Sequence, residues 1–404
     1  MERSVMHMDL DTFFVSVERL MDSRLNGKPV LIGGTSDRGV VASCSYEARV
    51  FGVHSAMPMK LARQLCPEAI IIRGNSSSYL KYSDIVSGIV QEAVPLFEKT
   101  SIDEFYCDLT GMDRFFGCYK FASEMRQKVI KETGLPISFG LSANKTVSKV
   151  ATGEAKPNNQ ILVQRGTEKS FLAPLSIRKI PMVGEKTYQI LRNLGIKDIR
   201  TLQDMPVELL QRTLGENGLM IWKKANGIDD SPVVPFHERK SLSTERTFDK
   251  DTIDVEKLRG LIIAMTENLA YQLRKGDKLT SCVTMKIRYS DFQTQTLQCR
   301  IPYTSADHLL VPKLLELFEK LYQRRVLVRL IGVRFSHLVS GGYQINLFDD
   351  NEERINLYQA MDKMRQRYGD RAVIKAAGIQ AQTIGRMDNP FDGGPPVLLA
   401  NRKS

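Results

Sequence analysis

Two short apolar runs that lie far apart in the sequence each lead into a pair of carboxylates. Val5–Met8 is followed by Asp9-Leu10-Asp11, and Asp103-Glu104 follows Ser101-Ile102 in a segment, 100–109, with the pattern of a hairpin. An unpaired carboxylate is costly at the end of a buried strand, so each pair could be a strand-end cap or part of an ion pair. Two such pairs could instead hold two divalent cations, the arrangement that suits in-line phosphoryl transfer.

Strand-like and helix-like segments alternate over the first 165 residues, which predicts an α+β sheet domain. Besides the hairpin, strands are expected at 4–10, 30–33, 39–43, 69–72 and 137–142. Helices are expected at 12–24, 57–66, 79–97 and 116–132. Both acidic pairs therefore fall in one sheet domain, which supports the metal-site interpretation.

The pattern changes after Gly166. Residues 170–228 predict short helices separated by glycines, and 229–235 predicts a linker. A second α+β module is expected over 242–339, with helices near 254–274 and 306–323 and strands near 279–289, 293–301 and 328–338. The tail has one helix-like stretch, Glu353 to Tyr368, and ends in a segment, 389–396, with a composition typical of disorder.

The chain is basic, with a formal net charge of +11. A solvated basic surface and a polyanionic partner both explain this excess. Part of it lies in 236–339, which contains 18 Lys and Arg against 12 Asp and Glu. In the strand Cys282 to Tyr289, apolar residues alternate with Thr284, Lys286 and Arg288, so one face is polar and basic. That face fits either an open solvated sheet or a sheet that lies on a phosphate backbone.

Several classes of protein are excluded by what the sequence lacks. None of the six cysteines forms a Cys-x-x-Cys pair and the five histidines are isolated, so a zinc site is not expected. We find neither a signal-peptide pattern nor the roughly 18 consecutive apolar residues of a membrane span. We therefore expect a cytoplasmic protein with reduced thiols and no membrane partner.

Three segments carry groups that could bind phosphate. Arg49, close to the hydroxyls of Ser45 and Tyr46, could bond two phosphate oxygens, although an exposed helix turn with a Glu47 ion pair is the commoner explanation. Lys156 is a second candidate cation, or else a surface lysine. Around Gly184 the pattern predicts helix, tight turn and helix, which would bind phosphate through backbone N–H groups, with a plain helical hairpin as the alternative.

Two aromatic or apolar segments complete the candidates. Phe13 is expected in the core, whereas Phe14 would lie about one turn beyond the acidic residues, where a rigid ring could exclude a ribose 2′-hydroxyl. Gln344-Ile345-Asn346-Leu347-Phe348 lies between a Gly-Gly turn and an acidic stretch. Apolar residues in such a tail are typical of a peptide that docks into a groove, or of a loose loop.

Taken together, these motifs resemble those of the Y-family translesion DNA polymerases, and most closely the DinB-type, polymerase IV branch. The resemblance covers about residues 5–348, and its motifs are specific in combination, order and spacing. It is carried by Asp9 to Phe14, Tyr46 to Arg49, Ser101 to Glu104, Ala155 to Asn158 and Lys240 to Phe248, the last being similar to the start of a little-finger domain.

The resemblance implies an α+β multidomain fold, a right-hand polymerase with a ferredoxin-like palm, small fingers, a helical thumb with a helix–hairpin–helix, and an α+β little finger. The implied parts are the palm at 1–10 and 73–165, fingers at 11–72, thumb at 166–232, linker at 233–243, little finger at 244–340, and a tail at 341–404.

The resemblance also implies roles for single residues. Asp9, Asp103 and Glu104 would bind two Mg²⁺, which Mn²⁺ can replace, with the Leu10 carbonyl as a further ligand. The incoming dNTP would contact Phe13, Phe14, Ala42, Ser43, Tyr46, Arg49 and Lys156, with Phe14 as the steric gate and Ala56 and Met57 completing the roof. Primer–template DNA would contact Gly184, Lys186, Thr187, Lys286, Arg288, Arg334 and Ser336. A sliding clamp would bind the peptide Gln344–Phe348 through Gln344, Leu347 and Phe348.

The activity so implied is low-fidelity, template-directed DNA synthesis past lesions, without proofreading, by a monomer that acts in the cytoplasm at the nucleoid. Two alternatives are a catalytically inactive scaffold that binds DNA or a clamp, and a nucleotide cyclase on a palm-like fold. The intact acidic residues argue against the scaffold. A cyclase would need neither the helix–turn–helix nor the basic second module. The chain departs from the simplest family members in the more than fifty residues that follow the clamp-like peptide.

Overall fold

The chain folds into two units that divide between His237 and Glu238. The computed structural model describes residues 2–112, 117–341, 351–369, 372–376 and 378. Each unit has its own hydrophobic core.

A five-stranded sheet with the order β5-β6-β1-β7-β8 is the centre of the first unit. The middle strand β1 (Val5–Leu10) runs antiparallel to β6 (Glu104–Asp108) on one side and to β7 (Ile137–Ser142) on the other. The outer strands are β5 (Leu96–Lys99) and β8 (Gln160–Leu162). Since Met6, Met8 and Leu10 are almost fully buried, β1 is a central strand that the first apolar run correctly predicted.

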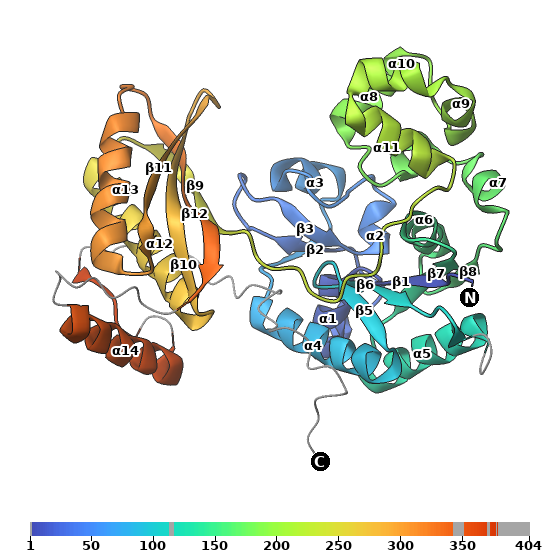
Figure 1. Ribbon diagram of the computed structural model, residues 1–404, viewed down its shortest axis with the longest axis horizontal. Coiled ribbons are helices and arrows are strands. Elements are labelled where there is room, and N and C mark those ends of the chain that lie inside the picture. The colour runs from blue at the N-terminus through green and yellow to red at the C-terminus, as the bar shows by residue number, and fades with distance from the viewer. Residues whose placement is uncertain (1, 113–116, 342–350, 370–371, 377, 379–404) are drawn as a thin grey trace. The chain divides into compact units, whose positions relative to one another are not determined.

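Helices cover both faces of this sheet. Met6, Met8 and Leu10 share one core with α1 (Phe13–Met21), α4 (Ser76–Ala93) and α5 (Cys118–Thr133), which lie together below the sheet in Figure 1. The other face, to which His7 and Asp9 point, carries α6 (Lys145–Ala155). Alternate residues of β1 therefore serve a hydrophobic core on one side and a polar cluster on the other.

A small sheet and a group of short helices complete the first unit. The sheet has the order β3-β2-β4, with β2 (Val30–Gly33) and β3 (Val41–Cys44) forming the expected hairpin beside β4 (Ile70–Ile72). It is joined by η1 (Ser23–Leu25), α2 (Tyr46–Arg49) and α3 (Met59–Leu65). The expected helical region is confirmed and consists of α7 (Glu168–Leu172), η3 (Ile177–Lys179), α8 (Glu185–Asn193), α9 (Ile199–Asp204), α10 (Val207–Leu214) and α11 (Glu216–Ala225).

The second unit is a four-stranded antiparallel sheet with the order β11-β10-β12-β9, packed against two helices (Figure 1). Its elements are β9 (Ser241–Thr252), α12 (Val255–Lys275), β10 (Lys278–Tyr289), β11 (Thr294–Thr304), α13 (Asp307–Leu321) and β12 (Val328–Ser340). The sequence predicted all of these except β9, in which only Leu242 and Phe248 are buried. A strand with so few apolar positions has no hydrophobic alternation to find.

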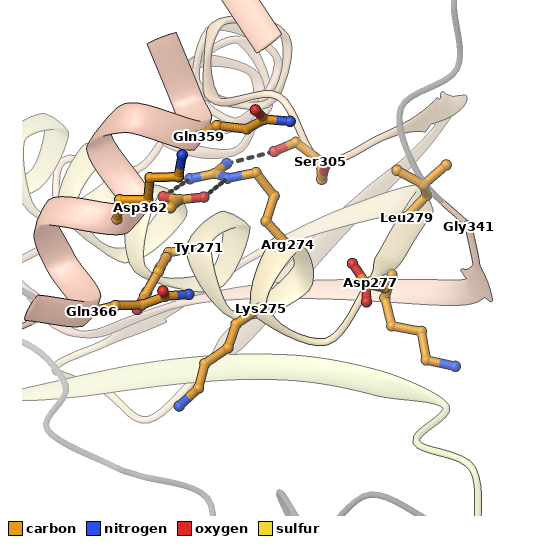
Figure 2. A pocket seen from close by; sticks show the side chains of 12 residues that line it. Tyr271, Arg274, Lys275, Asp277, Leu279, Ser305, Gly341, Gln359, Asp362 and Gln366 are labelled. Atoms are coloured by element: carbon orange, nitrogen blue, oxygen red, sulfur yellow. Dashed lines mark hydrogen bonds and ion pairs between the residues drawn. The ribbon is translucent and has the colours of Figure 1, made fainter. Parts of the chain in front are cut away.

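The expected tail helix is present as α14 (Asn351–Tyr368), and it packs against the second unit through buried charges. The Arg274 guanidinium donates hydrogen bonds to both carboxylate oxygens of Asp362 on α14 and, at 2.8 Å, to the Ser305 carbonyl (Figure 2). The same guanidinium lies 2.9 Å from Asp307 at the start of α13. Figure 2 shows Arg274, Ser305 and Asp362 at the wall of a cavity. The cavity has a volume of about 290 Å³ and is lined mainly by residues of α12 and α14.

One helix ends earlier than expected. The predicted helix 79–97 is instead α4, which begins at Ser76 and ends at Ala93, and residues 96–99 form β5. Pro95 explains the difference, since a proline disfavours helical backbone in the residue before it, and Val94 is extended with ψ 144°. The resulting edge strand pairs with β6, so it supports the strand that carries Glu104.

Candidate active site

The pairing of β1 with β6 places the predicted carboxylates at one end of the central sheet. Asp9 on β1 is directly opposite Glu104 on β6, so the two side chains leave the same face of the sheet. Asp103 precedes β6, and its carbonyl oxygen accepts a hydrogen bond of 3.0 Å from the Leu10 backbone N–H. The two acidic segments, far apart in sequence, therefore meet. The hairpin expected at 100–109 is wrong in its bounds, because that range holds only the turn and β6, and the first strand of the hairpin is β5.

Ser101 shapes the turn that presents the second pair. Its hydroxyl donates a hydrogen bond to the Asp103 carboxylate and accepts one of 3.0 Å from the Glu104 backbone N–H. A hydroxyl that bonds to backbone two or three residues on is a common turn-forming device. The serine before these two acids thus fixes the direction in which they leave the turn.

Two lysines contact the carboxylates from the α6 side. Lys156 Nζ lies 2.5 Å from Asp9 Oδ1, and Lys149 Nζ lies 2.7 Å from Glu104 Oε2. Lys156 was a predicted site residue, but Lys149 was not, because a single lysine inside a helix carries no motif of its own. Lys149 lies in α6, whereas Lys156 is the extended residue that follows the helix, so no helical spacing along the sequence links the two lysines.

Gly140 allows α6 to approach the sheet closely enough for these contacts. A Cβ atom at Gly140 would lie 2.3 Å from the Ser148 carbonyl oxygen and 2.6 Å from the Ala151 Cβ. Any side chain there would push the helix away from β7. The reach of Lys149 and Lys156 therefore depends on a glycine in the strand beneath them.

The electrostatic environment raises the pKa of the two aspartates. Burial raises the pKa of Asp9 to about 7, with Lys156 opposing the shift and the charges of Asp103 and Glu104 adding to it. Burial also raises the pKa of Asp103, against the hydrogen bond from Ser101. Several carboxylates that share a partly buried site raise one another's pKa in this way unless a cation is present.

Asp11 lies outside this cluster, although it belongs to the same acidic motif. It is almost fully buried and accepts hydrogen bonds from the Ser138 hydroxyl, at 2.9 Å, and from the Asn158 backbone N–H, at 2.6 Å. Lys156 Nζ is 3.8 Å away. The Asp9–Asp11 pair therefore does not act as one acidic patch. Asp9 faces the candidate site, and Asp11 fixes the turn that follows Lys156.

The donor set fits a hard divalent cation, because carboxylate and carbonyl oxygens are the ligands such ions prefer. Within the described parts of the chain, no three Asp, Glu, His or Cys side chains converge as a ready-made metal cluster. Asp9 and Glu104 are each turned toward a lysine, so both would have to exchange that partner for a cation.

Aromatic rings line the start of α1. Phe13 is 2% exposed and lies in the core, as expected, whereas Phe14 is half-buried at the core's edge. The Phe14 ring is stacked on Tyr79 of α4, with ring centres 4.3 Å apart and planes inclined by 15°. Tyr79 was not among the predicted site residues, because a tyrosine at a helical core position has no distinguishing pattern.

The predicted phosphate-binding residues lie on a short, capped helix. The Ser45 hydroxyl caps α2 by accepting a hydrogen bond from the Ala48 N–H, and the Arg49 guanidinium lies 4.8 Å from the centre of the Tyr46 ring. Glu47 is paired with Arg19 at 2.9 Å, which leaves Arg49 exposed. The Tyr46 hydroxyl is buried without a hydrogen-bond partner among the described residues, and burial raises its pKa to about 12.

On the neighbouring strand β3, Ala42 is exposed and Ser43 is buried. An unpartnered buried hydroxyl beside an exposed guanidinium is a reason to expect a bound anion near α2. Glu47 forms an ion pair on a helix turn, as in the commoner explanation for the Tyr46–Arg49 segment, but its partner is Arg19 on α1 and not Arg49.

The predicted turn around Gly184 lies at the start of α8. Gly184 is the N-cap residue, and Lys186 in the first turn is exposed, with Thr187 half-buried beside it. The space around Gly184 is open, since a Cβ there would meet nothing within 4 Å. The space beside the N-terminus of this helix is thus open, as a phosphate-binding turn requires.

The predicted basic face of the second unit is present on β10 and β12. Val283, Met285, Ile287 and Tyr289 are buried, and Lys286 and Arg288 lie on the opposite face with Arg334 and Ser336 of β12. Lys286 is bonded at 2.8 Å to Glu245 of β9. The unpredicted strand therefore neutralises part of this face.

Two expectations fall outside the described residues, the peptide Gln344–Phe348 and the terminal segment 389–396. Across the described residues, no helix combines the length and the apolar composition needed to cross a membrane.

Comparison with known families gives two matches, one in each unit. The sequence model of the impB/mucB/samB family matches residues 8–153, and that of the impB/mucB/samB family C-terminal domain matches 239–347. The first match contains the strands and turn that carry Asp9, Asp103 and Glu104, and the second contains the four-stranded sheet.

Curated relatives match over almost their whole length. The DNA polymerase IV of Dehalococcoides mccartyi strain BAV1 is 39% identical over 371 residues, which cover 91% of this chain and 95% of the relative. The DNA polymerase IV of Desulfatibacillum aliphaticivorans is 36% identical over 391 residues, 93% of this chain and 97% of the relative. A solved Y-family DNA polymerase chimera of Dbh and Dpo4 superposes with a TM-score of 0.74 at 26% identity, covering 84% of this chain and all of that one.

Proposed function

The chain belongs to the Y family of DNA polymerases, and from that premise we propose that its first unit copies damaged templates at a two-metal site built on Asp9, Asp103 and Glu104. As a family member it is a DNA-directed DNA polymerase that binds DNA and depends on a divalent metal. The meeting of β1 and β6, with Asp9 opposite Glu104, is the observation that carries the site assignment.

The reaction joins a dNTP to a primer. The primer 3′-hydroxyl attacks the α-phosphate and pyrophosphate leaves. Two Mg²⁺ ions, held by the three carboxylates and the Leu10 carbonyl, would activate the attacking oxygen and neutralise the developing charge, and Mn²⁺ could replace them. Because the carboxylates lie on neighbouring strands of a packed sheet, they keep a fixed geometry while primer and nucleotide exchange.

Arg49, Lys156 and the Tyr46 hydroxyl would hold the triphosphate. A guanidinium can bond two phosphate oxygens at once, and the unpartnered Tyr46 hydroxyl offers a further donor. Lys156 is now 2.5 Å from Asp9. Cation binding by Asp9 would release Lys156 for the phosphates, so loading of the metal and of the nucleotide would support each other.

Phe14 would act as the gate against ribonucleotides, with Phe13 packed behind it in the core. Ala42 and Ser43 would lie over the new base pair, where small side chains leave room for a distorted template base. That room is consistent with low fidelity.

Each unit would contribute residues that bind DNA without sequence preference. Gly184, Lys186 and Thr187 offer backbone and side-chain donors at a helix start, and Lys286, Arg288, Arg334 and Ser336 lie on the open face of the second sheet. The protein would act as a monomer at the nucleoid. Gln344–Phe348 would recruit it to a sliding clamp, a role that rests on the sequence of that peptide alone.

Primer extension tests the proposal. Asp103→Ala should abolish extension on undamaged and abasic templates with Mg²⁺ while leaving primer–template binding nearly unchanged. Asp108→Ala is the matched control, because Asp108 lies at the other end of β6, where it accepts a hydrogen bond from the Thr110 N–H. Extension that persists in Asp103→Ala would refute the site. Tight DNA binding without extension by the wild type would favour the scaffold alternative.

A further inference from the structure

Tyr79, whose ring packs against the candidate sugar gate Phe14, is fixed by several contacts. Tyr79 is 4% exposed, and its ring is stacked face to face on Phe14 at 4.3 Å. Phe13 flanks both rings, with centres 5.6 Å from Phe14 and 6.3 Å from Tyr79. One face of the Phe14 ring is therefore covered by Tyr79, so the Phe14 side chain has no free space to move toward that side.

Two further contacts fix Tyr79 itself. Its hydroxyl donates a hydrogen bond of 2.5 Å to Oε1 of Glu18, which is 8% exposed. The backbone of Gly74 lies close to the same end of the side chain, since a Cβ there would lie 3.0 Å from both Cε2 and the hydroxyl oxygen of Tyr79. Tyr79 is thus stacked on Phe14, has the Gly74 backbone close to its hydroxyl end, and is hydrogen-bonded to a buried carboxylate.

Phe14 and Glu18 are four residues apart on α1, so they lie on the same side of that helix. Tyr79 comes from α4, the neighbouring helix of the same core. A single tyrosine therefore connects the gate ring to a carboxylate one turn further along the gate's own helix. This leaves Phe14 little freedom to tilt away from α1 unless Tyr79 moves as well.

We propose that Tyr79, locked by Glu18, is a positioning residue for sugar selection, which holds the Phe14 ring rigid against a ribose 2′-hydroxyl. The inference rests on the proposed role of Phe14 as the gate and adds what makes that gate effective. A steric gate rejects a nucleotide only if its ring cannot yield, and a ring in a close-packed interior yields only when the neighbours behind it also move. A deoxyribose exerts no such pressure, so Tyr79 matters little to the correct substrate.

The test is the ratio of kcat/KM for a dNTP to kcat/KM for the matching rNTP, measured by single-nucleotide primer extension with the full chain. Tyr79→Leu should lower this ratio by about two- to tenfold, the factor that loss of one aromatic pair supports. The kcat for the dNTP should stay within about twofold of the wild type, since one aromatic contact away from the reacting atoms is lost. Tyr79→Phe keeps the ring and loses only the bond to Glu18, so its ratio should lie between those of Tyr79→Leu and the wild type.

A double mutant separates positioning from independent action. In a Phe14→Ala background, Tyr79→Leu should produce no further fall in the ratio, because the ring it supports is gone. Val86→Ala is the matched control, since Val86 lies in the same core on the same helix and is fully buried. It should reduce stability without changing the ratio.

The outcomes distinguish the gate from its support. If Phe14→Ala leaves sugar discrimination unchanged, the gate assignment fails and the inference fails with it. If Phe14→Ala lowers the ratio but Tyr79→Leu and Tyr79→Phe do not, only the role of Tyr79 is overturned. A further fall in the double mutant, or an equal fall in Val86→Ala, would also overturn it. If Tyr79→Leu does not fold, Tyr79→Phe decides alone, and a ratio equal to the wild type's contradicts the proposal.

Discussion

At the scale of single residues, the candidate site is a set of carboxylates whose present partners are lysines. Lys156 contacts Asp9 and Lys149 contacts Glu104, at 2.5 and 2.7 Å. Burial disfavours the charged form of Asp9 more than Lys156 favours it, so the pKa of Asp9 is raised to about 7. Without a cation, an ionised Asp9 thus costs the folded protein free energy, and metal binding would remove that cost.

A prediction about stability follows from the sign of this shift. The pKa of Asp9 is higher in the folded chain than in the unfolded one, so the stability it contributes is present at low pH and is lost as pH rises from about 4 to 7. Asp9→Asn, which is neutral throughout, should be more stable than the wild type at pH 8 in the presence of a chelator. The difference should shrink toward pH 4.

Thermal unfolding across that pH range measures the effect. Asp22→Asn is a suitable control, because Asp22 is only half-buried and hydrogen bonds from Arg24 lower its pKa, so its shift has the opposite sign to that of Asp9. If the Asp9→Asn variant is no more stable than the wild type at pH 8, the prediction is wrong and Lys156 fully compensates the buried charge of Asp9.

At the scale of secondary-structure elements, the contact between α6 and β7 determines where the lysines reach. Gly140→Ala would place a Cβ 2.3 Å from the Ser148 carbonyl oxygen, a backbone atom that can move only with the helix. We expect a loss of stability of about 1–3 kcal/mol, the usual cost of overpacking. Because α6 carries Lys149 and leads into Lys156, the KM for dNTP should rise as well.

Gly153→Ala is the matched control for that variant. Gly153 lies in α6 itself, and a Cβ there would meet nothing within 4 Å. Alanine at an exposed helical position should stabilise the protein by roughly 0.5–1 kcal/mol. Urea unfolding and dNTP titration of both variants check the prediction. Equal behaviour of the two would mean that the close approach at Gly140 is unimportant.

The elements also show how far sequence reasoning reached. Asp9, Asp103 and Glu104 could be predicted to meet because each follows an apolar run within one sheet domain, and the alternation in Cys282 to Tyr289 correctly gave the buried face of β10. Lys149 and Tyr79 could not be found in this way. Their positions depend on a helix packed over Gly140 and on a stacked ring, and neither leaves a pattern along the chain.

At the scale of the whole molecule, the tail helix α14 is part of the second unit. Arg274 lies between Asp307 and Asp362, and its side chain is 5% exposed. Although burial lowers the pKa of Arg274, the two carboxylates hold it above its usual value. The sequence predicted the helix but not its docking, because the buried partners come from three separate segments.

Arg274→Met should destabilise the second unit by about 3–5 kcal/mol, since two buried carboxylates would lose their counter-charge. Hydrogen exchange in α14 should speed up more than in the sheet. Arg259→Met is the control, because Arg259 lies on the same helix but pairs with Glu319 at an exposed site, where an ion pair contributes about 0–1 kcal/mol. Equal effects of the two variants would mean that α14 does not depend on Arg274.

The central claim is that Asp9, Asp103 and Glu104 together bind the metal ions of nucleotidyl transfer. The most direct test counts the Mn²⁺ ions bound by the chain with a dideoxy-terminated primer–template and the next dNTP, by following free Mn²⁺ with electron paramagnetic resonance. We predict two ions for the wild type and fewer for Asp103→Ala, with DNA binding retained. An equal count in the two proteins would contradict the claim and place the metal site elsewhere.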